Sequence, residues 1–149
     1  MFRLLRTSSD NPDFRGLVLQ LDAELRIRDG DDHDFYAQYN KLEAIKHVVL
    51  AFENNTPVGC GALKKFSEDT IEVKRMFVPL EYRSKGIASM LLKDLENWAA
   101  EMAYSKCILE TGEKQPEAIA LYKKNHYRII PNYGQYAGVK TSICFMKEI

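Results

Sequence analysis

The segment from Arg83 to Ser89 contains residue types that could hold an anion. Gly86 gives the backbone freedom and leaves room for a ligand to approach closely. A helix is expected to begin here, and the first N–H groups of a helix lack intrahelical acceptors and carry the positive end of its dipole. The segment therefore predicts a site for the pyrophosphate of a nucleotide cofactor. Its predicted contact residues are Arg83, Ser84, Lys85, Gly86, Ile87, Ala88 and Ser89.

A strand and a helix must position this loop. Residues Thr70–Val78 are rich in Ile, Val, Met and Phe and contain no Gly or Pro, which favours a strand. Pro79 cannot donate to a ladder, so strand pairing should end there. After the loop, apolar residues recur at helical spacing and predict an amphipathic helix packed on the sheet. They are Ile87, Leu91, Leu92, Leu95, Trp98, Ala99 and Met102.

The strand–loop–helix pattern is common by itself, but a second block follows it. Residues Ser105–Thr111 predict another strand, which Gly112 breaks. Pro116 suits the first turn of a further helix, whose apolar side would include Leu121 and Tyr122. Rival phosphate loops of the G-x-G-x-x-G or G-x-x-x-x-G-K-[ST] type are absent from the sequence.

These residues, taken in order, resemble the acetyl-CoA-binding core of the GNAT superfamily of N-acetyltransferases. The resemblance covers about half of the chain well, and the flanks fit in their order of elements. It implies acetyl-CoA as acyl donor. It also implies a sheet that splays between its fourth and fifth strands, where the pantetheine arm would pair with the backbone of Met76, Phe77 and Val78.

The same resemblance assigns roles in the second block. Tyr122 matches the tyrosine whose hydroxyl lies near the cofactor sulfur, which makes it the candidate general acid. Gln115 replaces the usual asparagine and should still allow an amide contact to the cofactor. His126 stands where glycine usually ends this helix. We expect Asn125 to take the left-handed conformation instead, because asparagine tolerates it.

The identity of the general base stays open between two carboxylates. An amine must lose a proton to attack a thioester, so a base near the acceptor is required. Glu72 matches the strand glutamate that serves as base in some members of the superfamily, although it could equally face solvent beside Lys74. Glu110, on the next strand, could face the same cleft.

Two further segments concern the acceptor amine. Residues 29–34 concentrate four aspartates, among which Asp31 and Asp32 are candidates to attract a cationic amine. A solvated loop with a helix cap is the plainer interpretation. The loop Pro131–Gly138 carries Tyr133 and Tyr136, which would suit a wall or lid over a small substrate.

Composition agrees with a single domain over residues 1–149. The chain is 46% hydrophobic and 28% charged, which argues against disorder. Lys+Arg and Asp+Glu both number 21, and a nucleic-acid-binding protein normally shows a basic excess. Without an apolar run long enough to span a membrane or a signal-peptide core, we expect a cytoplasmic protein with no membrane partner. Three cysteines, Cys60, Cys107 and Cys144, lack metal-ligand spacing, so we expect reduced, buried thiols and no metal.

The remaining segments complete the predicted fold. We expect a mixed α+β fold of the GNAT acyl-CoA N-acyltransferase type, with a mostly antiparallel sheet of about seven strands flanked by about four helices. The other predicted strands are 2–6, 45–53, 58–66, 127–130 and 141–147, with a first helix marked by Leu17, Leu21 and Leu25 and a second helix over 35–44.

These observations predict an acetyl-CoA-dependent N-acetyltransferase that acts on a primary amine of a small molecule or peptide, by direct attack in a ternary complex. The alternative is a non-catalytic module that binds acyl-CoA. A covalent mechanism through cysteine is disfavoured, because none of the three thiols has a neighbouring histidine in sequence. The resemblance also allows a homodimer.

Overall fold

The computed structural model describes residues 1–30 and 45–149, so the predicted helix over 35–44 lies outside the described residues. A seven-stranded sheet has the order β1-β2-β3-β4-β5-β7-β6. Its strands are β1 (Phe2–Thr7), β2 (His47–Glu53), β3 (Thr56–Lys65), β4 (Thr70–Phe77), β5 (Lys106–Gly112), β6 (Arg128–Ile130) and β7 (Ser142–Glu148). The described helices are α1 (Pro12–Asp29), α3 (Ile87–Glu101) and α4 (Pro116–Lys124), with short 3₁₀ helices η2 (Leu80–Tyr82) and η3 (Gly134–Tyr136). This is the mixed architecture that the sequence predicts.

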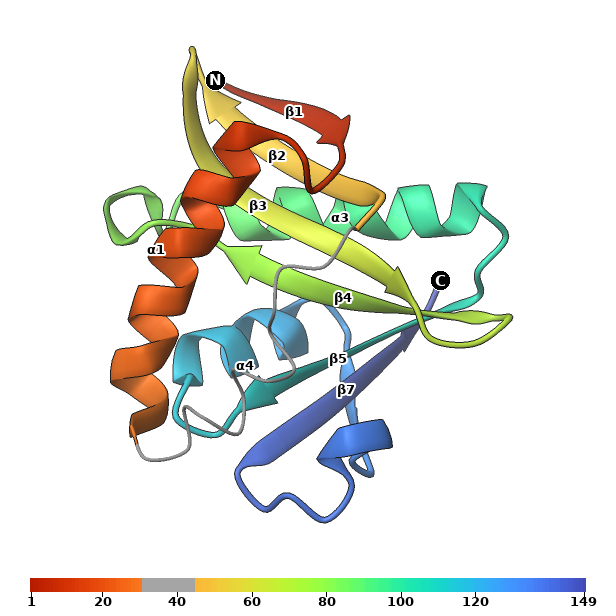
Figure 1. Ribbon diagram of the computed structural model, residues 1–149. Helices are drawn as coiled ribbons and strands as arrows, with labels where there is room; N and C mark the ends of the chain where they lie inside the picture. Colours follow the sequence, from red (N-terminus) through yellow and green to blue (C-terminus); the bar gives the residue numbers. More distant parts are fainter. Residues whose placement is uncertain (31–44) are drawn as a thin grey trace.

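Strands β4 and β5 form the parallel pair of an otherwise antiparallel sheet. Their pairing runs only from Thr70↔Lys106 to Glu72↔Ile108. Beyond these residues the two strands diverge, as Figure 1 shows. The predicted splay is therefore present, and within the described ranges 1–30 and 45–149 the backbone of β4 after Glu72 has no strand partner on the β5 side.

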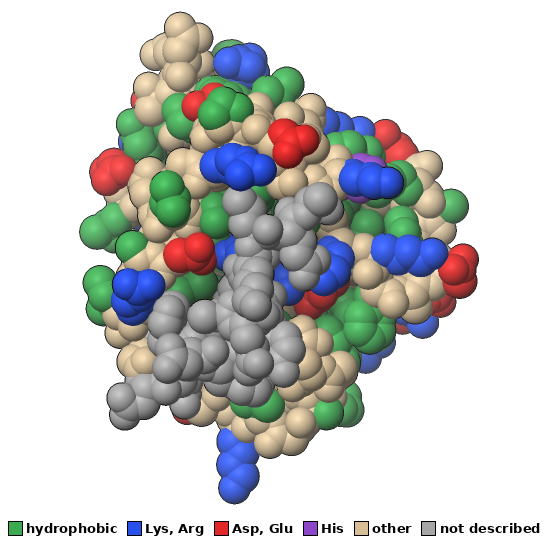
Figure 2. Space-filling model, viewed as in Figure 1, with side chains coloured by type: hydrophobic (Ala, Val, Ile, Leu, Met, Phe, Trp, Pro, Cys, Tyr) green, Lys and Arg blue, Asp and Glu red, His purple; other side chains and the backbone are tan. Residues whose placement is uncertain are grey.

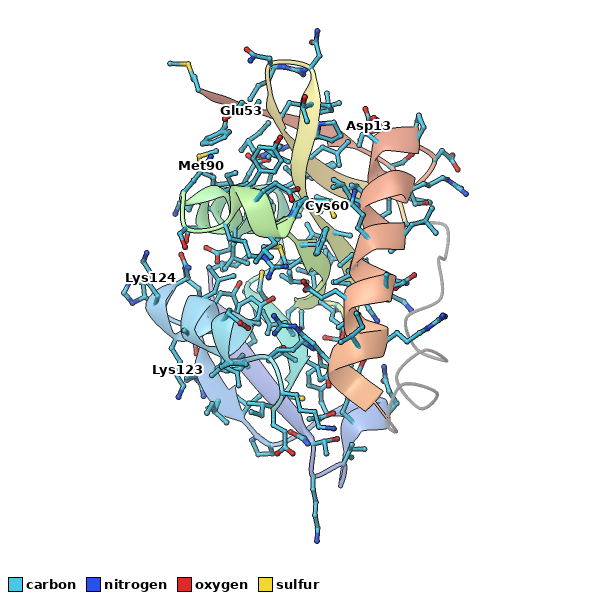
Figure 3. All side chains as sticks on the ribbon, turned by 90° about the vertical axis from the view of Figure 1, so that its left-hand side faces the viewer. Asp13, Glu53, Cys60, Met90, Lys123 and Lys124 are labelled. Atoms are coloured by element: carbon cyan, nitrogen blue, oxygen red, sulfur yellow. The ribbon has the colours of Figure 1, made fainter. Side chains whose placement is uncertain are left out.

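Helices cover both faces of the sheet. Residues of α1 such as Phe14 and Leu17 pack with Val48, Leu50 and Cys60 on one face. On the other face, the apolar side of α3 and part of α4 pack over β3, β4, β5 and β7. Figure 3 shows α1 on one side and α3 with α4 on the other, with Cys60 labelled between them. None of the described helices is long and apolar enough to cross a membrane.

Two local expectations differ from the structure. Strand β3 begins at Thr56, earlier than predicted, because Asn54 takes a positive φ of 55° and the turn closes within fewer residues. At the end of α4, Asn125 has a φ of −92°, while His126 has the left-handed φ of 72°. The expectation for Asn125 was therefore wrong. Asn125 instead donates its side-chain amide to the carbonyl of Leu121 at 2.9 Å, which caps the helix while the next residue makes the turn.

Candidate active site

A cavity of about 530 Å³ opens at the N-terminus of α3. Its walls come from α1, the end of β4, the loop before α3, the start of α3, and α4. Every residue predicted to contact the cofactor lines this cavity except Lys85, whose Nζ lies 5.5 Å from the ring centroid of Tyr82. The strand, loop and helices thus converge on one space.

The N-terminus of α3 faces this cavity without a side-chain cap. Gly86, at the cap position, has φ 82° and ψ 7°, and among the described residues no side-chain cap hydrogen bond is made to this helix start. A Cβ built on Gly86 would meet no atom within 4 Å, so the space beside the helix start is open. Ser84, two residues earlier, also has a positive φ of 65°. The arrangement leaves backbone N–H groups available to an anion.

Ion pairs link α1 to the loop before α3 and to α4, which also border this cavity. Arg83 donates from Nη2 to Oε1 of Glu24 at 2.7 Å, and from Nε to the carbonyl of Val78 at 2.7 Å. Arg28 donates from Nη1 to Oε2 of Glu117 on α4 at 2.7 Å. This hydrogen bond lowers the pKa of Glu117. Both guanidinium groups near the predicted phosphate site therefore already have carboxylate partners.

A smaller cavity of about 100 Å³ adjoins the first, since Leu21, Met76, Gln115, Ala118 and Tyr122 line both. It lies where β4 and β5 diverge, and residues 72–76 and 110–112 form its strand walls. The two cavities together connect the N-terminus of α3 with the interior of the splayed sheet.

Both candidate bases, Glu72 and Glu110, line the smaller cavity. Glu72 pairs with Ile108 across the sheet, so Glu110, two residues further along β5, has its side chain on the same face. Glu72 is only 7% exposed, and Oε2 accepts a hydrogen bond from the hydroxyl of Tyr133 at 2.7 Å. Burial, with the nearby charge of Glu72, raises the pKa of Tyr133, so this hydroxyl keeps its proton and acts as the donor.

Tyr122 is the candidate acid, and it reaches both cavities from α4. Its ring packs 5.7 Å from that of Phe145 and 5.9 Å from that of Tyr127, measured between centroids. Burial raises the pKa of the Tyr122 hydroxyl, and the charge of Glu110 adds to the effect. The phenol therefore remains protonated at neutral pH and can donate a hydrogen bond, although the raised pKa makes it a weaker acid than an exposed tyrosine.

The residues predicted for the acceptor have different positions. Tyr136 lines the smaller cavity, whereas Tyr133 does not and instead holds Glu72. Asp31 and Asp32 lie outside the described residues. Burial raises the pKa of the Cys60 and Cys107 thiols to about 12, so neither is a nucleophile at neutral pH.

Sequence reasoning missed several residues that line these cavities. Arg75 lies on the wall of the smaller cavity and Glu24, Arg28 and Glu117 on that of the larger one. A sequence signal for Arg75 existed, since two adjacent basic residues, Lys74 and Arg75, break the alternation of an ordinary strand. The α1 pairs join residues far apart in the chain, and no local pattern indicates them.

Comparison with known proteins supplies an independent finding. The family model described as "Acetyltransferase (GNAT) family" matches residues 12–127. An "IAA acetyltransferase" of Azospirillum brasilense is 35% identical over 102 residues, which cover 68% of this chain and 67% of the relative.

Solved structures extend the similarity to nearly the whole chain. A Klebsiella pneumoniae protein assigned to the acyl-CoA N-acyltransferases has a TM-score of 0.84 and 26% identity, covering 99% of this chain and 97% of that one. The PaiA N-acetyltransferase of Thermoplasma acidophilum, solved in complex with coenzyme A, has a TM-score of 0.77 at 16% identity, covering 100% and 99% of the two chains.

Proposed function

Because this chain belongs to the GNAT family of acetyltransferases, we propose that it transfers an acetyl group from acetyl-CoA to a primary amine by direct attack in a ternary complex. The observation that carries the proposal is the junction of the two cavities. An uncapped helix N-terminus borders one, two carboxylates border the other, and Tyr122 borders both.

The residues present fit acetyl-CoA as the donor. The cavity of about 530 Å³ is within the usual size range of cofactor sites. The open space at Gly86 leaves the N–H groups of α3 accessible to a diphosphate, and the unpaired side of β4 offers backbone groups to the pantetheine arm. When bound, acetyl-CoA supplies a thioester carbonyl carbon, which gains a bond to the amine nitrogen as its bond to sulfur breaks.

The side chains at the junction provide a candidate for each of the two proton transfers. Glu72 or Glu110, directly or through water, would take the proton that the acceptor nitrogen loses. Tyr122 would donate its hydroxyl proton to the departing thiolate. The hydrogen bond from Tyr133 fixes the orientation of the Glu72 carboxylate, so that its other oxygen can be directed to the acceptor.

The proposal is tested by measuring free thiol released from acetyl-CoA across a panel of amines, alongside thermal unfolding with acetyl-CoA. We expect amine-dependent thiol release. Ligand at one hundred times its dissociation constant should add ~2.7 kcal/mol to the free energy of unfolding. Binding without release for any amine would favour a non-catalytic acyl-CoA-binding module. Absence of both would refute the proposal.

A further inference from the structure

Arg75 is a buried basic residue on the wall of the smaller cavity. Its side chain is 3% exposed, and its backbone has a positive φ of 59°. A non-glycine residue in this conformation costs free energy, and such residues cluster at functional sites. Arg75 therefore calls for an explanation beyond its place in a strand.

A β-bulge gives Arg75 its direction. Ala62 pairs with Lys74 and Cys60 with Phe77, so two residues of β4 oppose the single residue Gly61 of β3. Met76 lies on the α3 side, because a Cβ on Gly61 would meet its sulfur at 2.6 Å and Leu95 at 2.7 Å. Arg75 contacts α1 on the opposite side. Because of the bulge, the side chain of Arg75 lies on the same face of the sheet as Glu72 and Glu110.

The guanidinium of Arg75 has only part of its hydrogen-bonding capacity used. Nη1 donates to Oδ1 of Asp22 at 2.8 Å. Nη2 is buried and has no hydrogen-bond partner among residues 1–30 and 45–149. Buried donors without partners are rare in proteins, and a guanidinium binds carboxylate oxygens well because its N–H groups match their geometry.

The charges around the smaller cavity are complementary to a molecule with both signs. Glu72 and Glu110 can attract an ammonium group, while Arg75 can bind a carboxylate. These three residues, and Lys74, which also lines the cavity, come from the two diverging strands. The cavity, at about 100 Å³, admits only a small group.

We propose that the acceptor is a small amino acid, whose carboxylate binds Nη2 of Arg75 and whose amine lies toward Glu72 and Glu110. This inference rests on the proposed acetyl transfer and names the substrate class of that site. The nitrogen of the amino acid gains the acetyl group, its proton passes to the base, and the products are an N-acetyl amino acid and the CoA thiol.

The first test uses the wild-type protein with matched acceptors. Glycine, L-alanine and L-serine are each compared with their own amides, which keep the amine and remove the negative charge. We expect kcat/KM to be at least about tenfold higher for a free amino acid than for its amide, because a buried polar group discriminates against a ligand that leaves it unpaired. The amine of an amide loses its proton more readily, so intrinsic reactivity opposes this result. Equal or better turnover of every amide would overturn the inference.

The second test compares Arg75→Lys with Arg6→Lys. Lysine keeps the charge but loses the forked geometry of the guanidinium. Arg6 is a matched control, because it pairs with Asp94 and Glu101 and lines neither cavity. We expect Arg75→Lys to raise KM for the amino acid about tenfold and to abolish the preference over the amide, with the acetyl-CoA thermal shift retained. If Arg75→Lys keeps the preference for the free amino acid over its amide, the role of Arg75 is only structural, through its ion pair with Asp22 on α1.

The outcomes separate the inference from the function on which it rests. Turnover of amides and simple amines without preference for a carboxylate contradicts the amino acid acceptor and leaves acetyl transfer standing. No turnover and no acetyl-CoA shift contradicts both. Where Arg75→Lys fails to fold, the wild-type comparison of acids with amides still decides.

Discussion

At the scale of single residues, the hydroxyl of Tyr122 is the group whose removal should have the clearest kinetic effect. Tyr122→Phe keeps the ring packing against Phe145 and removes the proton donor. We expect kcat to fall about ten- to a thousandfold with little change in acetyl-CoA affinity, which is the range of one acid–base contact. Steady-state kinetics and a binding titration would measure the two quantities.

Tyr127→Phe is a matched control for this change. Tyr127 is buried beside Tyr122, but its hydroxyl donates to Oε2 of Glu96 at 3.0 Å, and it lines neither cavity. This variant should lose stability without loss of kcat. Equal kcat in wild type and Tyr122→Phe would make Tyr122 a packing residue.

The two candidate bases can be separated by pH. Glu72→Gln can still accept the hydrogen bond from Tyr133, so the change removes the charge and little else. If Glu72 is the base, the loss of turnover should be greatest at low pH and shrink as pH approaches the pKa of the amine, near ~10 for an alkylamine, where free amine is abundant. Rate profiles of Glu72→Gln and Glu110→Gln would be compared. The opposite assignment follows if only Glu110→Gln shows this dependence.

Sequence reasoning located these side chains better than it located their partners. The resemblance placed Glu72 as a candidate base, and the position of Glu110 on the next strand suggested it for the same cleft. The structure lines one cavity with both. Sequence reasoning could not foresee the hydrogen bond between Tyr133 and Glu72, whose positions are 61 residues apart. The direction of Arg75 was also hidden, because a bulge depends on pairing with Gly61 and not on the strand alone.

At the scale of elements, the start of α3 is the feature most specific to anion binding. Gly86→Val should be tolerated sterically, since a Cβ at this position meets no atom within 4 Å. The left-handed φ of 82° makes the substitution strained, by roughly 1–2 kcal/mol. We expect acetyl-CoA affinity to fall more than this strain alone explains, because the side chain would project beside the helix N-terminus.

Gly138→Val is the control for this strain, since Gly138 has a φ of 78° and open space but lines neither cavity. Thermal unfolding of both variants with and without acetyl-CoA measures stability and affinity together. An equal acetyl-CoA shift in the two variants would contradict phosphate binding at Gly86.

The ion pairs between α1 and its neighbours predict a substitution that strengthens acetyl-CoA binding, in contrast to Gly86→Val, which should weaken it. Glu24 holds Arg83 at 2.7 Å, so a phosphate must compete with this carboxylate for the guanidinium. Glu24→Gln should therefore tighten acetyl-CoA binding about two- to fivefold, the effect of one partly exposed ion pair. Asp94→Asn, which removes a partner of Arg6, is the control. Weaker binding in Glu24→Gln would mean that Glu24 orients Arg83 instead of competing for it.

The elements themselves were largely predictable, because their signals are local. Pro79, Gly86 and Pro116 mark boundaries through backbone chemistry, and the apolar spacing of α3 matches its buried face. The identity of the left-handed residue after α4 was not predictable in this way. Asn125 caps the helix with its side chain, so His126 takes the left-handed conformation instead. The tolerance of asparagine for the left-handed conformation therefore indicated the wrong one of two adjacent residues.

At the scale of the whole molecule, the apolar packing differs between the two faces of the sheet, and this difference leaves room for the site at the splay. The α3 and α4 side packs against both halves of the sheet through residues such as Leu91, Leu109 and Phe145. The apolar cluster on the α1 side includes described residues of β2, β3 and the end of β4, but none of β5 or β7. Where β4 and β5 diverge, that face carries the polar side chains that line the smaller cavity. On the outer surface in Figure 2, basic and acidic side chains are interspersed. The core thus supports the sheet without filling the site.

The three buried thiols, spread over β3, β5 and β7, predict how the stability of the whole fold depends on pH. Burial raises the pKa of Cys60 and Cys107 from 9.0 to about 12, and that of Cys144 to about 11. Well below pH 9 both folded and unfolded chains keep these protons, so the thiols add no pH dependence to stability. Between pH 9 and about 12 the unfolded chain releases protons that the folded chain retains, so stability falls.

The free energy of unfolding should therefore be level from pH 7 to 8.5 and decline above pH 9, by at most ~1.4 kcal/mol per pH unit for each thiol. Urea unfolding at a series of pH values measures this slope. Cys60→Ala should be less stable at pH 7, because it leaves a cavity in the packing of α1, yet its decline above pH 9 should be shallower by the share of one thiol. Parallel slopes in the two proteins would show that Cys60 ionises no differently in the folded and unfolded chains. The alkaline loss of stability would then come from the other buried groups with raised pKa, which are Cys107, Cys144 and the tyrosines.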